Sequence, residues 1–299
     1  MNAGSIGFHK AMDFHYGVAD QVTPLVRRMV AENPSPYTFH GTNSYIIGHG
    51  QVAVIDPGPL LDGHIEALAA ALEGEVVSHI LVTHTHHDHS PAAKPLRELT
   101  GGVIAGALPR PIPDGATTAE SIHRNFAPDH VIADGDIFAS EGWSLEAVYT
   151  PGHISNHMCF ALHEENLLFT GDHIMGWNTT VVSPPDGNMA EYMASLERCL
   201  ERPEAAYWPG HGPVIPDPHP FVRAYRSHRL MREAEIIKCL QAGCETIGEM
   251  VMRMYRHIPE TMHHAAARSV LAHLELMAED GRVATDGAVT ADAVYRVNN

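Results

Sequence analysis

Short apolar runs bounded by glycine or polar residues recur through the first two thirds of the chain. Runs of this kind, rich in valine, isoleucine and leucine, are typical of buried strands. Three longer stretches in the same region repeat apolar residues every three or four positions, as an amphipathic helix does. The pattern predicts an α/β fold in which strands alternate with helices. We expect strands at 45–48, 51–56, 79–82, 103–106, 130–134, 145–150, 158–171 (a hairpin) and at the start of 205–213, and helices at 64–74, 91–102 and 188–200.

The pattern changes after residues 213–220, where proline recurs and interrupts any regular element. Beyond this stretch come three helical patterns and then two short strands around the turn dipeptide Asp286–Gly287. Three helices followed by a hairpin is the order of a small winged-helix domain. We therefore expect a first domain at 1–218 and a second at 219–299. The helices are expected at 221–241, 246–258 and 261–281, and the two strands within 282–297.

Two of the predicted helices carry a capping signal at their first residues. Asn188 is followed three residues later by Glu191, and Thr246 is followed at the same spacing by Glu249. In this arrangement the first side chain bonds a free backbone N–H of the first turn, and the glutamate bonds back to the cap. Both helices are therefore expected to begin at these positions.

The composition is that of an ordinary globular protein. The 299 residues are 44% hydrophobic and 18% charged. No segment reaches the ~18 consecutive apolar residues that span a bilayer. The N-terminal residues lack the basic and apolar regions of a secretory signal. The four cysteines have no zinc-ribbon or redox spacing, so we expect them to be reduced and mostly buried in a cytoplasmic protein without a membrane partner.

The net charge of −17 comes from the first predicted domain. Residues 1–220 contain 9 of the 19 Lys and Arg but 26 of the 36 Asp and Glu, whereas residues 221–299 contain 10 of each. An acidic body argues against broad, nonspecific attraction to nucleic acid. A local exception is a series of arginines at helical spacing, which forms either a solvated face or a contact for nucleic acid. The series consists of Arg223, Arg226, Arg229 and Arg232.

The stretch THTHHDHS, residues 83–90, follows a predicted buried strand. It contains the pattern H-x-H-x-D-H, formed by His84, His86, Asp88 and His89. Side chains two residues apart on an extended chain point to the same side, so His84 and His86 can reach one metal ion. Asp88 and His89 lie in the following turn and can face a second ion. Imidazole and carboxylate suit zinc and similar metals. A histidine-rich solvated loop is the alternative interpretation.

Three further strand ends carry side chains that can bind metals. His153 lies in the turn TPGH, Asp172 in TGD and His211 in PGHG, each directly after a predicted strand. A glycine beside each of them lets the backbone turn sharply and approach other groups closely. Four separate strand ends with such residues in one α/β chain predict a shared metal site.

This ordered set of motifs resembles that of the metallo-β-lactamase-fold hydrolases, the superfamily that includes glyoxalase II, lactonases and RNase Z. The resemblance covers roughly residues 20–215 and implies a four-layer αβ/βα sandwich. With the winged-helix pattern behind it, the chain is most similar to the β-lactamase-like protein 2 group. Animal members of that group are endoribonucleases acting on single-stranded RNA.

The resemblance also implies a ligand set for two zinc ions, with manganese or iron as other ions of suitable chemistry. The first ion would take His84, His86 and His153 and the second Asp88, His89 and His211, with Asp172 bridging both. Asp56 matches an aspartate that orients a metal-bound histidine. A hydroxide shared by the two ions would attack the substrate. The expected catalytic residues are Asp172 and Asp88, the latter holding the hydroxide or protonating the leaving group.

Other polar residues beside these motifs have less specific patterns. His87 should point away from the first metal and make a structural hydrogen bond. His157 and His173 flank predicted ligands, where each would either support a ligand or pack in the core. Asn178, Thr179 and His173 are the main candidates for lining the substrate pocket, and Thr180 is a further one.

Several functions remain open from the sequence. The resemblance favours a zinc-dependent endoribonuclease, and the alternative is a hydrolase of small acyl substrates such as a thioester, a lactone or a β-lactam. A DNA-binding protein without catalysis is a third hypothesis, against which the intact ligand set argues. The partner is therefore RNA or a small acyl compound, and the assembly state, a homodimer included, is left open.

The chain also departs from three better-known relatives. It places no cysteine among the predicted ligands, unlike the commonest class B β-lactamases. It has no clear match to the basic glutathione-binding residues of glyoxalase II, nor the long flexible arm of many RNase Z enzymes. These departures argue against those three assignments.

Overall fold

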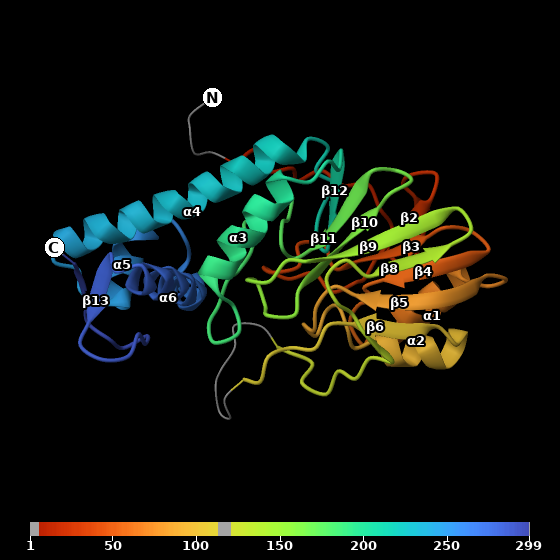
Figure 1. The fold of residues 1–299 in the computed structure, drawn as a ribbon, viewed down its shortest axis with the longest axis horizontal. Helices are drawn as coiled ribbons and strands as arrows, with labels where there is room; N and C mark the ends of the chain where they lie inside the picture. The colour runs from red at the N-terminus through yellow and green to blue at the C-terminus, as the bar shows by residue number, and fades with distance from the viewer. Residues whose placement is uncertain (1–5, 113–120, 299) are drawn as a thin grey trace.

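Two β-sheets lie face to face with helices on both outer sides, as the computed structural model of the chain shows (Figure 1). The structure describes residues 6–112 and 121–298. From one side to the other the layers are helix, sheet, sheet and helix, so the expected four-layer α/β sandwich is confirmed. A smaller helical region, blue in Figure 1, extends from one side of the sandwich.

The first sheet has seven strands that follow one another in chain order. The strands from β1 to β4 pair antiparallel, and those from β4 to β7 pair parallel. Parallel neighbours need a crossover connection, which α1 provides between β4 and β5 and α2 between β5 and β6. The elements are β1 (Asp20–Gln21), β2 (Val26–Val30), β3 (Asn43–Ile47), β4 (Gln51–Ile55), α1 (Asp62–Ala71), β5 (Val76–Val82), α2 (Ala93–Thr100), β6 (Val103–Gly106) and β7 (His130–Val131).

The second sheet has five strands in the order β12-β11-β10-β9-β8. All neighbours are antiparallel except β11 and β12, which are parallel and are joined through α3. As a result β9, β11 and β12 run in one direction and end at the same edge of the sheet. The elements are β8 (Ile137–Ser140), β9 (Trp143–Tyr149), β10 (Met158–Leu162), β11 (Leu167–Gly171), α3 (Met189–Leu200) and β12 (Ala206–Pro209).

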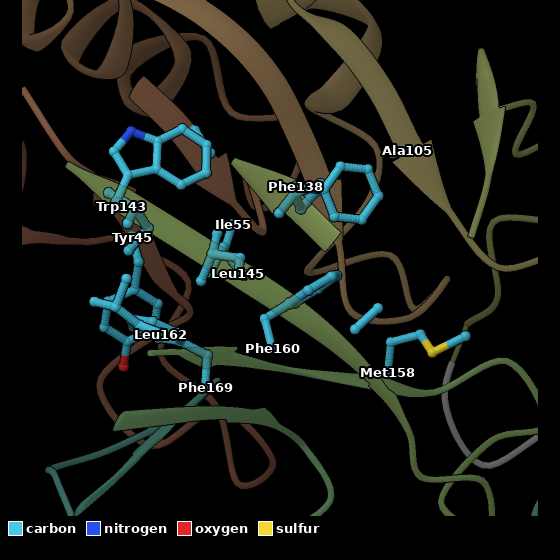
Figure 2. Packing of buried hydrophobic residues seen from close by; sticks show 14 of the residues in the cluster. Tyr45, Ile55, Ala105, Phe138, Trp143, Leu145, Met158, Phe160, Leu162 and Phe169 are labelled. Carbon is cyan, nitrogen blue, oxygen red and sulfur yellow. The ribbon is translucent and has the colours of Figure 1, made fainter. Parts of the chain in front are cut away.

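Large apolar side chains fill the space between the two sheets (Figure 2). Tyr45 from the first sheet meets Phe169 from the second with their ring centroids 4.8 Å apart. Strand β10 is buried on both faces: Phe160 packs between the sheets, while Cys159 and Ala161 pack toward α3. This alternation follows the two-residue period of a strand, and it explains why β10 is a continuous apolar run.

Helices cover the outer face of each sheet. Leu68 of α1 and Leu96 of α2 pack on the outer face of the first sheet. Leu196 of α3 packs on the outer face of the second sheet, together with Tyr225 from the first half of α4 (Pro218–Gln241). These contacts hold the sheets rigidly, which positions the turns at their ends.

The C-terminal region has a hydrophobic core of its own, to which the second half of α4 contributes Ile236 and Cys239. The three helices followed by a hairpin are present in the expected order. The long helix α4 therefore contributes buried side chains to two cores, and the expected boundary between residues 218 and 219 stays a prediction. The remaining elements are α5 (Ile247–Met254), a 3-10 helix (Glu260–Met262), α6 (His263–Glu279), β13 (Val283–Thr285) and β14 (Tyr295–Val297).

Some predicted elements differ from those in the structure. The sequence pattern did not predict β1, β2 or β8, and the strand expected at 130–134 is only the two-residue β7. The helix expected at 246–258 ends at Met254. Pro259 lies shortly after the end of α5, and the 3-10 helix lies between Pro259 and α6. Proline cannot donate a helical backbone hydrogen bond, which explains the break between α5 and α6.

The predicted helix caps form, one of them only in part. Thr246 and Glu249 make the full reciprocal capping box at the start of α5. The Asn188 side chain accepts a hydrogen bond from the backbone N–H of Glu191 over 2.9 Å at the start of α3. The Glu191 carboxylate pairs with Arg110 instead of returning to the cap.

The four cysteines are free, and three of them are buried, as expected. Within residues 6–112 and 121–298, no helix has the length and apolar character needed to cross a bilayer.

Candidate metal centre

The turns that follow β5, β9, β11 and β12 meet at one edge of the sandwich. Backbone hydrogen bonds join them: Met158 donates to the carbonyl of Thr83, and Gly210 donates to that of Gly171, each over 2.7 Å. The structure therefore brings together all seven residues that the sequence predicts as metal ligands. They are His84, His86, Asp88, His89, His153, Asp172 and His211.

Three histidine nitrogens form a first cluster. His86 Nδ1 lies 3.0 Å from His84 Nε2 and 3.0 Å from His153 Nε2. All three side chains are buried. Three nitrogens bound tetrahedrally to one zinc ion at the usual bond length would lie roughly 3.3 Å from one another. The spacing and the nitrogen donors therefore fit a single small cation.

Asp88, His89 and His211 form a second cluster. His211 Nε2 lies 3.1 Å from Asp88 Oδ2 and 3.2 Å from His89 Nε2. His89 Nε2 lies 3.4 Å from the same Asp88 oxygen. The Asp88 side chain is 20% exposed, whereas both histidines are almost fully buried. Solvent therefore reaches this cluster from the side of Asp88.

Asp172 lies between the two clusters. Its Oδ2 is 3.8 Å from His153 Nε2 of the first cluster and 3.3 Å from His211 Nε2 of the second. Its Oδ1 is 3.5 Å from His89 Nε2. Within the described part of the chain, this buried Oδ1 has no hydrogen-bond donor. A carboxylate in this position can contact a cation in each cluster.

Hydrogen bonds on the outer ring nitrogens determine which nitrogen of each histidine faces a cluster. His153 Nδ1 donates to the carbonyl of Val181 over 2.6 Å, and His211 Nδ1 donates to that of Gly41 over 3.1 Å. A carbonyl only accepts, so each of these Nδ1 atoms carries a proton, and the Nε2 atom is the one left for a metal ion. Nε2 therefore faces the cluster, and it is the atom that would bind a metal ion.

Asp56 orients one histidine in each cluster. Its carboxylate accepts a hydrogen bond from His89 Nδ1 over 2.7 Å and another from the Thr83 hydroxyl over 2.7 Å. The Thr83 proton is thereby directed to Asp56, so Thr83 Oγ1 accepts from His84 Nδ1, 2.9 Å away. Asp56 has a φ of 50°, an uncommon value for a residue other than glycine. Backbone strain of this kind is concentrated at functional sites.

Charge differs between the two clusters. In the first, burial and the nearby His89 hold the pKa of His84 well below its usual range. Burial and His153 lower the pKa of His86 to about 3. Both rings are therefore neutral at physiological pH and can bind a cation without first losing a proton.

In the second cluster, burial disfavours the charged form of every group. The attraction between the carboxylates and the histidine rings has the larger effect on their pKa values. Asp172 and Asp88 raise the pKa of His211 to about 10, and they raise that of His89 well above its usual range. The same attraction holds the pKa of both carboxyl groups well below theirs. The two carboxylates therefore favour positive charge at this point, which a divalent cation supplies.

Two other histidines near the motifs make hydrogen bonds to backbone groups. His87 points away from the clusters, and its Nε2 donates to the carbonyl of Ile122 over 3.1 Å, as the sequence predicts. His157 Nε2 accepts a hydrogen bond from the backbone N–H of Asp172 over 3.1 Å. Of the two roles weighed for His157, support of a predicted ligand is the one that the geometry favours.

The three predicted pocket residues have different surroundings. His173 is fully buried, with its ring centroid 4.9 Å from that of Tyr192. This position favours packing in the core over contact with a substrate. Asn178 and Thr179 line a cavity of 490 Å³ that also borders α4. Their contact with a substrate stays a prediction.

Sequence reasoning missed three contributors to the site and anticipated a fourth, the glycine beside His211. The carbonyls of Gly41 and Val181 act through backbone atoms, which no residue type signals. Thr83 is the first residue of the histidine-rich motif. Its place directly before His84 in the sequence was therefore a usable signal. Gly210 leaves space for the site: a Cβ there would lie 2.6 Å from Asp172 Oδ1. A glycine directly before His211 was the signal for such a close approach.

Comparison with known proteins agrees with this geometry. Residues 37–211 match the metallo-beta-lactamase superfamily, and residues 246–291 match the beta-lactamase associated winged helix domain. A metallo-beta-lactamase family protein from Thermus thermophilus has the same fold. Its TM-score is 0.74 at 21% identity, with 93% of this chain and 100% of that chain covered.

Curated relatives cover most of the chain. It is 34% identical over 288 residues to lactamase-like protein adaB of Aspergillus niger, with 90% of this chain and 84% of the relative covered. It is 34% identical over 273 residues to the beta-lactamase-like protein 2 homolog of Drosophila melanogaster, with 88% and 91% covered. It is 30% identical over 287 residues to the atrochrysone carboxyl ACP thioesterase dmxR1 of a Cryptosporiopsis species, with 89% and 83% covered.

The two clusters and these matches lead to one conclusion. The chain belongs to the metallo-beta-lactamase superfamily, carries the winged helix domain associated with it, and is a metal-dependent hydrolase.

Proposed function

We propose that the chain hydrolyses acyl thioesters with two zinc ions bound side by side. The observation that carries the proposal is the position of Asp172, whose carboxylate lies within 3.8 Å of histidine nitrogens from both clusters. A site with two adjacent cations is suited to reactions that develop negative charge on oxygen. The hydrolysis of a thioester is one such reaction, and a relative over most of the chain is described as an ACP thioesterase.

The donor set determines which residues would hold the ions. It consists of imidazole nitrogens and carboxylate oxygens, which suit zinc, and also manganese or iron. When bound, such a pair polarises the scissile carbonyl and lowers the pKa of a coordinated water. The first ion would be held by His84, His86 and His153 and the second by Asp88, His89 and His211, with Asp172 shared.

Two aspartates would have roles in the reaction beyond binding metal. Asp88 is partly exposed, so it can exchange a proton with solvent while its Oδ2 faces His211. Asp172 is held from behind by its backbone bond to His157, which keeps both carboxylate oxygens in the space between the clusters. A thiol has a pKa of about 8.5, so a thiolate departs without a strong general acid. This favours a thioester over an RNA phosphodiester, whose alkoxide leaving group needs a proton.

The arginines of α4 also favour a small acyl substrate over RNA. Arg229 is only 2% exposed, Arg226 pairs with Glu197, and Arg232 pairs with Glu235 over 2.6 Å. The series is therefore neither the evenly solvated face nor the free basic surface that the sequence left open. Binding to single-stranded RNA needs a positively charged groove that follows its backbone.

Endoribonuclease activity is the second candidate. It is supported by the similarity to the Drosophila beta-lactamase-like protein 2 homolog, which covers 91% of that protein. The two metal ions would serve equally at a phosphodiester. Cleavage through phosphate contacts would weaken steeply with salt, whereas thioester hydrolysis would not.

A substrate panel on zinc-loaded protein tests the proposal. The substrates are S-acyl N-acetylcysteamine, acyl-CoA, a homoserine lactone, a chromogenic cephalosporin and a short single-stranded RNA, each compared with the D172N variant. We expect the thioesters to be hydrolysed fastest, with little dependence on salt, and the variant to be inactive. Turnover of RNA alone, or thioester turnover that survives in the variant, would refute the proposal.

A further inference from the structure

A cavity of 490 Å³ lies between the sandwich and the C-terminal region. One wall is the segment 178–181, which follows the Asp172 turn, and another is α4. The remaining wall comes from the 3-10 helix and α6, through residues such as Met262 and Ala266. The volume is within the range of roughly 300–1,000 Å³ typical of small-molecule sites. The cavity is not part of either metal cluster.

Arg229 lines this cavity and lacks a partner of opposite charge. It is only 2% exposed, and within the described residues no carboxylate forms an ion pair with it. Its Nη2 donates to the carbonyl of Thr180, and its guanidinium carbon lies 4.9 Å from the ring centroid of Tyr192. Its Nε has no hydrogen-bond partner in the described part of the chain. A buried cation that is compensated only by a carbonyl and a ring is costly unless an anion binds beside it.

The other lining groups extend this chemistry. The guanidinium carbon of Arg232 lies 4.8 Å from the ring centroid of Tyr255, and Arg232 forms an ion pair with Glu235 near the surface. His228 lines the same side, and its Nδ1 is buried without a hydrogen-bond partner in the described residues. The rest of the lining is mixed: Asn178, Thr179, Thr180 and Ser269 are polar, whereas Phe8 and Met262 belong to an apolar wall. The cavity therefore combines an apolar wall with the guanidinium of Arg229, which is unpaired among the described residues.

We infer that this cavity binds an organic anion, a carboxylate or phosphate attached to an apolar body. Arg229 and Arg232 would contact the anionic group, and the apolar wall would contact the rest of the molecule. Charge-assisted hydrogen bonds to a guanidinium are the usual means by which proteins hold carboxylates and phosphates.

The cavity is linked to the metal centre through one short segment. Thr180, which lines the cavity, donates from its hydroxyl to the backbone carbonyl of Asp172 over 2.8 Å. Val181, also in the lining, accepts from His153 Nδ1. A molecule in the cavity is therefore one layer of residues away from the predicted ligands. If the proposed function is right, the bound anion is the charged end of the acyl substrate; this last step rests on that function, whereas the site itself does not.

Calorimetric titration of the full chain tests the site directly. Octanoate, octyl phosphate and octanol are titrated into protein stripped of metal by a chelator, so that anions cannot bind through zinc. We expect both anions to bind and octanol not to bind. The tighter of the two anions identifies the chemical source, carboxylate or phosphate. Octanol binding as tightly as the anions would overturn the inference.

Three arginine variants complete the test. R229Q and R232Q should each weaken anion binding at least about tenfold, as expected when a charge-assisted hydrogen bond is lost. R226Q serves as the control, because Arg226 is on the same helix, pairs with Glu197 and is not part of the lining. If the melting curve shows that R229Q does not fold, the anion affinity of R232Q decides whether the site exists. Anion binding that is unchanged in R232Q would refute the site, and thioester hydrolysis is measured separately, so failure of either proposal is distinguishable.

Discussion

Asp56 accepts a hydrogen bond from His89 Nδ1 over 2.7 Å, at the base of both metal clusters. Through Thr83 the same carboxylate also orients His84. One residue outside the predicted ligand set therefore orients one histidine in each cluster.

Replacing Asp56 should weaken metal binding without abolishing it. In D56N the charge that holds His89 Nδ1 is lost, and the ring gains freedom to rotate. We expect zinc affinity to fall roughly 10–100-fold, the usual effect of losing such a supporting contact. Competition with a chromogenic chelator measures it. D62N, an exposed aspartate at the start of α1, is the control, and equal affinities in the two variants would contradict this role.

Asp172 should be required for both ions. D172N keeps the shape of the side chain but removes the charge that lies between the clusters. We expect the zinc content to fall below two per chain and the hydrolysis rate to fall by a factor on the order of 10³. Elemental analysis and initial rates on the same sample measure the two effects. Full zinc content together with a normal rate would show that Asp172 does not bridge the ions.

Replacement of Gly210 even by alanine should disturb the site. A Cβ at this position would lie 2.6 Å from Asp172 Oδ1 and 2.7 Å from His89 Cε1. G210A should therefore displace a predicted ligand of each ion, lower the zinc affinity and destabilise the fold by about 1–3 kcal/mol, as overpacking does. Gly248 in α5 has open space around it, and G248A should instead stabilise by up to about 1 kcal/mol. Thermal melts and zinc titrations compare them, and wild-type behaviour of G210A would be inconsistent with the close approach.

Glu275 should make stability depend on pH. Burial and the neighbouring Glu279 on α6 raise the pKa of Glu275 from 4.5 to about 7. Between these two values the folded chain keeps a proton that the unfolded chain loses, so stability falls as the pH rises through this window. E275Q should remove the dependence. Because the side chain is partly solvated, we expect an effect of about 1 kcal/mol between pH 5 and 8.

Urea unfolding at several pH values measures this effect. E260Q, a change at an exposed carboxylate in the 3-10 helix, is the control. A slope against pH that is the same in E275Q and in the parent chain would show that Glu275 is not responsible.

Local patterns predicted the site better than they predicted the sheet edges. The predicted ligands follow apolar strands, and His153, Asp172 and His211 also stand beside glycine, so these positions could be predicted from the sequence. The strands β1 and β8 are too short to show a clear pattern, and as edge strands they are only partly buried. Their pairing depends on neighbours far along the chain, which a local pattern does not contain.

Contacts between residues that are far apart along the chain could not be predicted from the sequence. The spacing of Arg229 on its helix indicates a basic stripe, yet the structure buries that residue against Tyr192. The burial depends on where α4 crosses α3, which is a tertiary property. The same is true of the carbonyl of Val181, which holds His153 only because two distant loops meet.

The 24 residues of α4 form a continuous rod of about 36 Å that is built into two cores. Its near end is held by Tyr225 and its far end by Ile236, with Arg229 between them. The C-terminal lobe consequently cannot swing as a hinged lid, because any such movement would pull apolar side chains out of one core or the other. Melting should thus proceed as a single cooperative event, and a protein cut before this rod would expose the apolar side chains that Tyr225 covers beside α3 and become prone to aggregate.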